Sequence, residues 1–141
     1  MVEKFFGYGV DLTKLKFNNV GEFVKKYTNS IYEDAISDLD DVDKDILVWL
    51  DNYQNDSGYY GLSAYLGEVI NQEEDLELSC YDSVTYGYIY VQSNYPWALT
   101  DKMKSLTKES LEAIMIKYLS QITETEIRCE YLTMWRSTID D

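Results

Sequence analysis

One stretch, residues 81–97 (YDSVTYGYIYVQSNYPW), constrains the fold more than any other, because it combines strand-forming residues with the chain's one proline. It holds five of the fourteen tyrosines and one of the three tryptophans. Residues 76–81 and 86–92 both alternate in side-chain type, and a polar turn, 82–85, lies between them. This pattern predicts an antiparallel hairpin. Pro96 then ends the ladder, because proline has no N–H to donate.

The two faces of this hairpin differ in chemistry. Tyr86, Tyr88 and Tyr90 fall on one face, and Ile89 and Val91 on the other. Helices packed on the aliphatic face would leave the tyrosine-rich face uncovered, but the sequence leaves open whether Tyr86, Tyr88 and Tyr90 are exposed. A homodimer through that face would be compatible with the sequence, provided that the contact is mostly apolar.

Two further strands are predicted, one at each end of the chain. Residues 4–10 alternate, and Gly7 and Gly9 indicate either a bulge or the close approach of another backbone. Residues 126–135 alternate strictly. We place four of these residues on one face and four on the other: Ile127, Cys129, Tyr131 and Trp135 against Arg128, Glu130, Leu132 and Met134.

Helices are predicted over residues 18–28, 30–39, 46–53, 60–72 and 107–122. The 60–72 segment has an apolar stripe, and Gly61, Ala64 and Gly67 are small positions where another element could come close. The 107–122 segment has the clearest helical pattern, with Thr107 as the N-cap. Its buried stripe is predicted to be Leu111, Ile114, Met115, Tyr118, Leu119 and Ile122.

Strands and helices that do not alternate regularly indicate an α+β fold. We therefore predict a single α+β domain over residues 1–141, with a sheet of about four mostly antiparallel strands and helices packed mainly on one face. No apolar run approaches the ~20 residues of a membrane-spanning helix. The N-terminal residues do not have the pattern of a signal peptide, so we expect a cytoplasmic location in the cell that makes the protein.

The residue types present exclude several kinds of chemistry. Histidine is absent, which removes Ser-His-Asp and Cys-His catalysis and most zinc sites. Cys80 and Cys129 are predicted to be reduced and buried. An aspartate-rich run, 38–45, lacks the glycine and glutamate of a calcium-binding EF-hand loop. We therefore predict no metal, no cofactor and no enzymatic activity.

The net charge of −14, from 26 acids and 12 bases, disfavours binding to nucleic acid or to an anionic membrane. Part of the acidity has a local explanation, because Asp41 or Asp43 would cap the helix predicted after it. A solvated acidic surface is the simplest explanation of the remainder. The alternative is that the acids face a basic partner.

About half of the chain is similar in sequence to a known group of proteins. The segment from Leu62 to Thr125 includes a glutamate-rich helix end, Tyr95-Pro96-Trp97, Leu106-Thr107-Lys108-Glu109 and Lys117-Tyr118. It resembles a group of small acidic proteins from Gram-positive bacteria and their phages or mobile elements. The resemblance implies a cell type and a fold but no chemical mechanism.

We expect an acidic inhibitor that mimics nucleic acid and occupies a basic protein surface, such as the groove of a nucleic-acid-binding protein. Small anti-defence proteins of phages, including many anti-CRISPR proteins, have this size and charge. A basic groove gains counterion-release energy from any well-spaced polyanion, and tyrosines are common interface anchors. The partner-binding residues predicted on this basis are Asp38, Asp40, Asp41, Asp43, Asp45, Glu73, Glu74, Asp75, Tyr59, Tyr60 and Tyr88.

Two alternatives stay open. An immunity protein that neutralises a basic toxin would need the same kind of acidic face. A carboxylate-dependent hydrolase would use acids such as Asp38, Asp40, Asp41, Glu73 and Glu74, although their spacing is not diagnostic.

Overall fold

A computed structural model describes residues 2–27, 61–81, 88–92, 97 and 99–137, and these residues form a single α+β fold. Four strands make one antiparallel sheet in the order β2-β3-β1-β4. The helices predicted over 30–39 and 46–53 lie outside the described residues. The elements are β1 (Val2–Asp11), η1 (Leu12–Lys14), α1 (Val20–Tyr27), α4 (Gly61–Glu74), β2 (Ser79–Tyr81), β3 (Tyr88–Gln92), α5 (Asp101–Lys104), α6 (Lys108–Leu119) and β4 (Glu130–Ser137).

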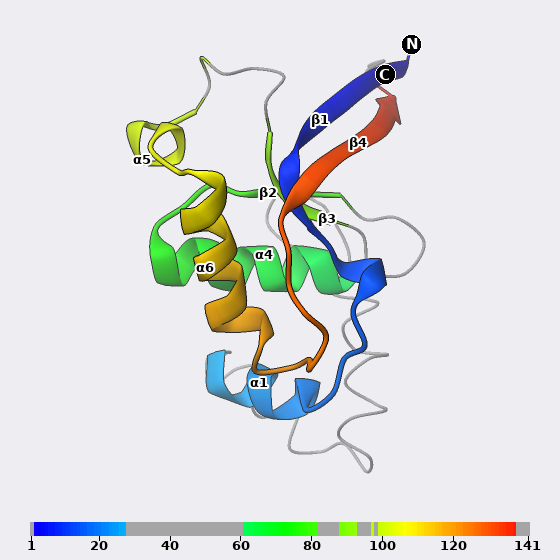
Figure 1. The fold of residues 1–141 in the computed structure, drawn as a ribbon, viewed down its shortest axis with the longest axis vertical. Helices are drawn as coiled ribbons and strands as arrows, with labels where there is room; N and C mark the ends of the chain where they lie inside the picture. Colours follow the sequence, from blue (N-terminus) through cyan, green and yellow to red (C-terminus); the bar gives the residue numbers. More distant parts are fainter. Residues whose placement is uncertain (1, 28–60, 82–87, 93–96, 98, 138–141) are drawn as a thin grey trace.

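The central strand is β1, which pairs with β3 on one side and with β4 on the other. Figure 1 shows β1 and β4 running together beyond the helices, with the start of β1 beside the end of β4 at the tip of this ribbon. The predicted hairpin is confirmed, because Cys80 faces Ile89 and Tyr81 faces Tyr88 across β2 and β3. The organising strand is nonetheless β1, since the hairpin joins the rest of the sheet through it.

The two glycines of β1 allow another strand to approach closely, as predicted. A Cβ atom on Gly7 would lie 2.0 Å from the Val91 carbonyl oxygen, and one on Gly9 would lie 2.0 Å from that of Ile89. The side chain of Tyr90 crosses the same positions, at 2.9 Å from the Gly7 site and 2.7 Å from the Gly9 site. Any larger residue would therefore force β1 and β3 apart.

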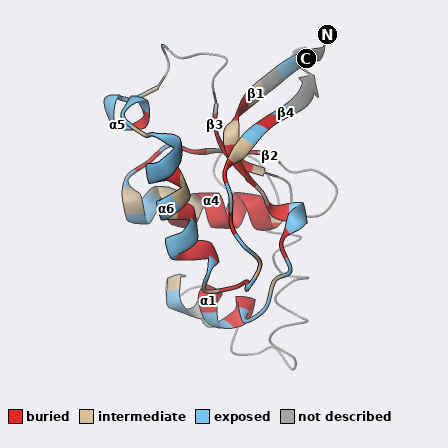
Figure 2. Cartoon of the chain, in the orientation of Figure 1, coloured by how far each residue is buried: buried red, intermediate tan, exposed pale blue. Residues whose placement is uncertain are grey.

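The main core lies on the face of the sheet that carries Val10, Ile89 and Val91, and α1, α4 and α6 all contribute to it. Figure 2 shows α4 buried along most of its length, whereas α6 keeps one exposed side. The apolar positions that predict the α4 stripe are all buried: Leu62, Tyr65, Leu66, Val69 and Ile70. The buried surface is wider than this stripe, because Ser63, Ala64 and Gly67 are buried as well. Gly67 faces β2, where a Cβ would lie 3.9 Å from Cys80 Cβ.

The start of α6 confirms the predicted cap. The Thr107 side chain accepts a hydrogen bond from the Ser110 N–H, and Ser110 Oγ accepts one from the Thr107 N–H at 2.8 Å. This reciprocal capping box satisfies two donors that a helix otherwise leaves exposed. The stripe predicted for α6 is buried except for Ile114, which is only partly covered.

Whether the tyrosine-rich face is exposed, which the sequence leaves open, is answered for Tyr90, because this residue is completely buried. Tyr90 forms a second, smaller cluster with Leu132, and Tyr81 and Tyr88 pack against it. Because Gly7 and Gly9 have no side chains, the ring of Tyr90 can lie flat on the sheet there. Tyr86 lies outside the described residues.

The start predicted for the last strand is wrong, whereas Tyr131 and Leu132 lie on opposite faces, as predicted. The strand begins at Glu130, after Ile127 and Cys129, which are buried in the main core. Past that point Tyr131 is 64% exposed, while Leu132 is buried against Tyr90. The alternation continues, but the covered face changes, because β4 runs beyond the helices as it leaves the core (Figure 1).

Candidate functional site

The end of α4 carries three of the predicted partner-binding residues, Glu73, Glu74 and Asp75. Asp75 has a positive φ of 54°, and the Leu76 N–H donates to the Asn71 carbonyl at 3.1 Å. This is the left-handed cap that usually takes glycine. The Asn71 side chain also binds the backbone of Leu78, with Oδ1 2.8 Å from the Leu78 nitrogen. Asn71 thereby fixes the turn into β2 and explains why that strand begins only at Ser79.

Glu74 is partly buried and is held in place by the two later helices, α5 and α6. Its carboxylate accepts a hydrogen bond from Lys117 Nζ at 3.0 Å and another from the Tyr118 hydroxyl, both from α6. Its backbone carbonyl accepts from Lys102 Nζ of α5. These three contacts tie the end of α4 to both later helices. Lys102 and Lys117 also bring positive charge to the C-terminus of α4, where acidic residues interact unfavourably with the helix dipole.

The ionisation of this group follows from its contacts. Hydrogen bonds from Tyr118 and Lys117 lower the pKa of Glu74. Burial and the neighbouring Glu74 carboxylate raise the pKa of the Tyr118 hydroxyl. Glu74 is therefore a charged structural acid, and Tyr118 is a neutral hydrogen-bond donor to it.

The sequence-predicted residues thus have different surroundings. Glu73 and Asp75 are exposed, whereas Glu74 is partly buried and paired. Tyr88 is partly buried and stacks on Tyr81, with ring centroids 5.6 Å apart. It lies on the face of the sheet opposite α4, so the sheet separates it from the acids. The remaining predicted residues lie outside the described residues: Asp38, Asp40, Asp41, Asp43, Asp45, Tyr59 and Tyr60.

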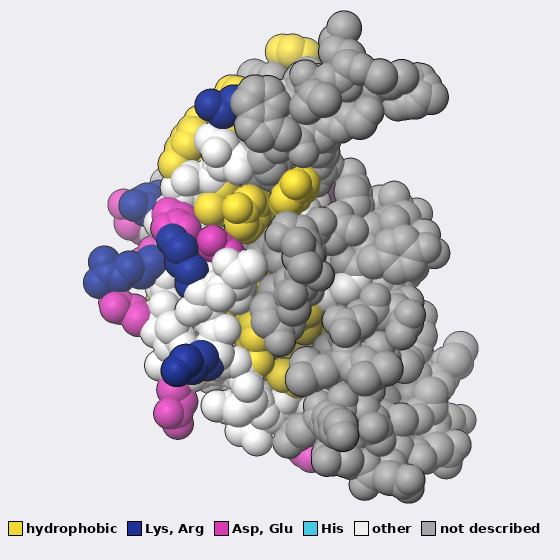
Figure 3. All heavy atoms as spheres, turned by 90° about the vertical axis from the view of Figure 1, so that its right-hand side faces the viewer, with side chains coloured by type: hydrophobic (Ala, Val, Ile, Leu, Met, Phe, Trp, Pro, Cys, Tyr) yellow, Lys and Arg dark blue, Asp and Glu magenta, His cyan; other side chains and the backbone are white. Residues whose placement is uncertain are grey.

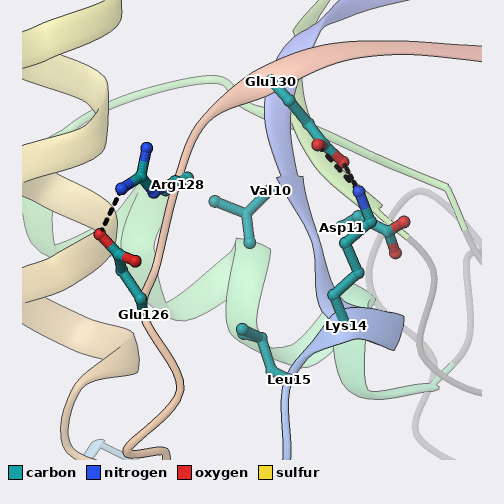
Figure 4. Close-up of a pocket in the computed structure, with 7 residues that line it drawn as sticks. All are labelled: Val10, Asp11, Lys14, Leu15, Glu126, Arg128 and Glu130. Atoms are coloured by element: carbon teal, nitrogen blue, oxygen red, sulfur yellow. Dashed lines mark hydrogen bonds and ion pairs between the residues drawn. The ribbon is translucent and has the colours of Figure 1, made fainter.

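A surface hollow of about 230 Å³ opens where the chain enters β4 beside the end of β1 (Figure 4). Buried Val10 and Leu15 form its apolar floor. Its rim carries two ion pairs, Lys14–Glu130 at 2.7 Å and Arg128–Glu126 at 2.8 Å, together with Asp11.

Most of the charged side chains around this hollow pair with one another. The hydrogen bond to Glu130 raises the pKa of Lys14, and that to Glu126 raises the pKa of Arg128. Asp11 accepts from the Thr13 N–H at 3.0 Å. Sequence reasoning missed the hollow because Lys14 and Glu130 are 116 residues apart. No local spacing relates them.

Among the described residues, no group of three or more Cys, Asp or Glu side chains is arranged to hold a metal ion. Both cysteines are buried, as predicted. Burial raises the pKa of the Cys129 thiol to about 12, which makes it a poor nucleophile at neutral pH.

Comparisons with known proteins give no relative. No family model matches the chain, and no match was found among curated proteins or solved structures. In the part of the chain that the structure describes, no helix is both long and apolar enough to cross a membrane.

Proposed function

We propose that this chain is a non-enzymatic protein-binding module whose acidic residues engage a basic protein surface. The observation that carries the proposal is the uneven distribution of charge along the sequence. The described ranges contain 14 acids and 11 bases, so they are close to balance. Residues 28–60 contain nine acids and one lysine, and thus supply −8 of the net charge of −14.

Three acids of the described residues, which we call the framework, have a positively charged partner. Glu74, Glu126 and Glu130 each pair with a lysine or an arginine. With a single lysine among nine acids, the 28–60 segment cannot balance its own charge. Acids that only keep a protein soluble need not be concentrated in one segment, since acids spread over the whole surface have the same effect.

The partner class that this charge fits best is a nucleic-acid-binding protein, whose basic groove accepts a polyanion. Together with the resemblance to proteins of Gram-positive bacteria and their mobile elements, this favours an inhibitor of the anti-CRISPR kind, acting in the host cytoplasm. The principal candidates for binding the partner are Asp40, Asp41 and Asp43, and Tyr59 and Tyr60 are candidates for apolar anchors of the same contact. Glu74 does not support the hydrolase alternative, because its carboxylate already accepts hydrogen bonds from Tyr118 and Lys117.

The test is a pull-down from a Gram-positive host, identified by mass spectrometry, followed by binding measurements on the purified partner at low and high salt. We expect the partner to bind nucleic acid and to be displaced by duplex DNA. A captured toxin would instead favour an immunity protein. Binding that is insensitive to salt would contradict the proposal, because exposed charge contacts are screened.

Two variants that remove the same number of charges from different places test whether the position of the acids or only the net charge determines the affinity. The triple variant Asp40→Asn, Asp41→Asn and Asp43→Asn removes three charges from the acidic segment. The control replaces three exposed framework acids, Glu109, Glu124 and Glu126, with glutamine. We expect at least a tenfold loss of affinity in the first and a much smaller change in the second. Equal losses would show that only net charge matters.

A further inference from the structure

The outer edge of β4 is open among the described elements. The strand runs from Glu130 to Ser137 at one end of the order β2-β3-β1-β4, and no described strand lies beyond it. Natural edge strands are usually short or interrupted by proline or inward-pointing charge. This one has eight residues and contains neither proline nor glycine. An edge of this kind is a template for pairing with another strand.

The side chains described near the start of this edge suit a contact. Tyr131 is 64% exposed and stacks on Phe6 of β1, with ring centroids 6.1 Å apart and planes inclined by 22°. Exposed tyrosines on a rigid strand are typical interface anchors. Figure 3, which views the molecule from the right of Figure 1, shows hydrophobic side chains gathered above a group of charged ones.

The sequence of β4 is complementary to itself when it is read in the antiparallel direction. With Thr133 opposite its own copy, each position on one side of the centre meets a chemically matched position on the other. An acid meets a base, an aromatic residue an aromatic one, and an aliphatic residue another aliphatic one. The pairs are Glu130 with Arg136, Tyr131 with Trp135, and Leu132 with Met134.

We propose that β4 pairs antiparallel with the β4 strand of a second copy, around a two-fold axis at Thr133. Such a contact is isologous, and antiparallel pairing is what a two-fold axis between identical strands produces. Cross-strand aromatic pairs and opposite charges are the pairs that stabilise antiparallel strands. The two four-stranded sheets would then form one continuous sheet of eight strands.

Charge distinguishes this contact from the proposed binding of a basic partner. Two chains of −14 repel each other, so salt should strengthen the dimer by screening that repulsion. Salt should weaken binding to a basic partner. The two proposals therefore respond to salt in opposite directions, and either can fail without the other.

The first test is disulfide trapping of the full chain with Thr133→Cys. Directly opposed residues of an antiparallel pair have Cα atoms about 4.5–5.5 Å apart, within the range that a disulfide accepts. We expect mild oxidation to give a covalent dimer. The control is Ala113→Cys, at an exposed position on α6, which should remain monomeric. Equal cross-linking of the two variants, or none in either, would overturn the proposal.

The second test measures mass by light scattering with the unmodified chain over a range of concentrations. We expect it to approach twice the 16.5 kDa of one chain as concentration rises. Thr133→Lys places two like charges on the axis and should weaken the dimer at least tenfold. Thr133 is exposed, so folding should survive, as circular dichroism would verify. A chain that stays monomeric at every concentration and salt would refute the proposed pairing.

The third test addresses the register. Arg136→Glu places an acid opposite Glu130 of the second copy and should weaken the dimer. Adding Glu130→Lys in the same chain restores opposite charges at both symmetric pairs and should recover most of the loss. Glu130→Lys alone is the second reference, because Glu130 also pairs with Lys14 of its own chain. Failure of the double variant to recover, with both variants folded, would exclude this register.

Discussion

The junction between α4 and α6 and the region beside the β1–β4 ribbon each contain a lysine–glutamate pair, but their surroundings differ. At the junction, the Glu74 side chain is 22% exposed and also accepts from the Tyr118 hydroxyl. Beside the ribbon, Glu130 is 39% exposed and Lys14 is 63% exposed. The two lysines are about equally exposed, at 65% for Lys117 and 63% for Lys14, so the difference is that water competes more strongly for the Glu130 carboxylate than for that of Glu74.

This difference bears on how an acidic protein uses its acids. Glu73, Glu74 and Asp75 are consecutive in the sequence, yet only Glu74 is held by side chains of another helix. An acid whose oxygens already accept a hydroxyl and an ammonium donor is a poor contact for a partner. A run of acids therefore need not act as one binding patch. Four predictions test this contrast between junction and ribbon.

The largest effect should come from the buried apolar core to which α4 contributes. Leu66 of α4 is completely buried, and Leu66→Ala should lower the free energy of unfolding by about 2–5 kcal/mol. Tyr131→Ala on the ribbon should change it by less than about 1 kcal/mol in dilute solution, because most of that side chain is exposed. Urea unfolding of both variants measures the difference. Equal losses would mean that the ribbon is as tightly packed as the helices.

The next effect concerns the Glu74 carboxylate. Glu74→Gln keeps the shape but removes the charge that Tyr118 and Lys117 contact. We expect a loss of about 1.5–3 kcal/mol, the range for hydrogen bonds to charged groups. Tyr118→Phe should reproduce part of it, and the double variant should lose less than the sum. Strict additivity, measured by urea unfolding, would argue against a shared network.

The pH dependence gives an independent check. Because the folded-state pKa of Glu74 is lowered, its stabilisation is fully present above the unfolded-state pKa of about 4.3. The stabilisation is lost as pH falls through the lower folded-state value. The stability advantage of the natural chain over Glu74→Gln should therefore hold at neutral pH and shrink below about pH 4. An advantage that is the same at pH 3 and pH 7 would assign the effect to shape instead of charge.

The smallest effect should come from the exposed pair. Glu130→Gln removes the contact with Lys14 and should change the free energy of unfolding by less than about 1 kcal/mol. High salt should abolish even that difference. A loss as large as that of Glu74→Gln would show that the Lys14–Glu130 pair is shielded from water.

Much of the local structure follows from the sequence. Spacing alone predicts the hairpin, the Thr107 cap and most of the apolar stripe of α6, because these depend on residues close together in the chain. The two glycines of β1 likewise indicate the close approach of a neighbouring strand, since only the missing side chains leave room for it. The α+β class follows from the order in which these patterns occur.

The tertiary structure decided which faces are covered and which acids are paired. Tyr131 alternates with Leu132 as a core residue would, but only the position of the helices shows that Tyr131 lies beyond them. Glu74 meets Lys117 across 43 residues, and Lys14 meets Glu130 across 116. Periodicity carries no information at such separations, since it reports the direction of a side chain and not what lies opposite it.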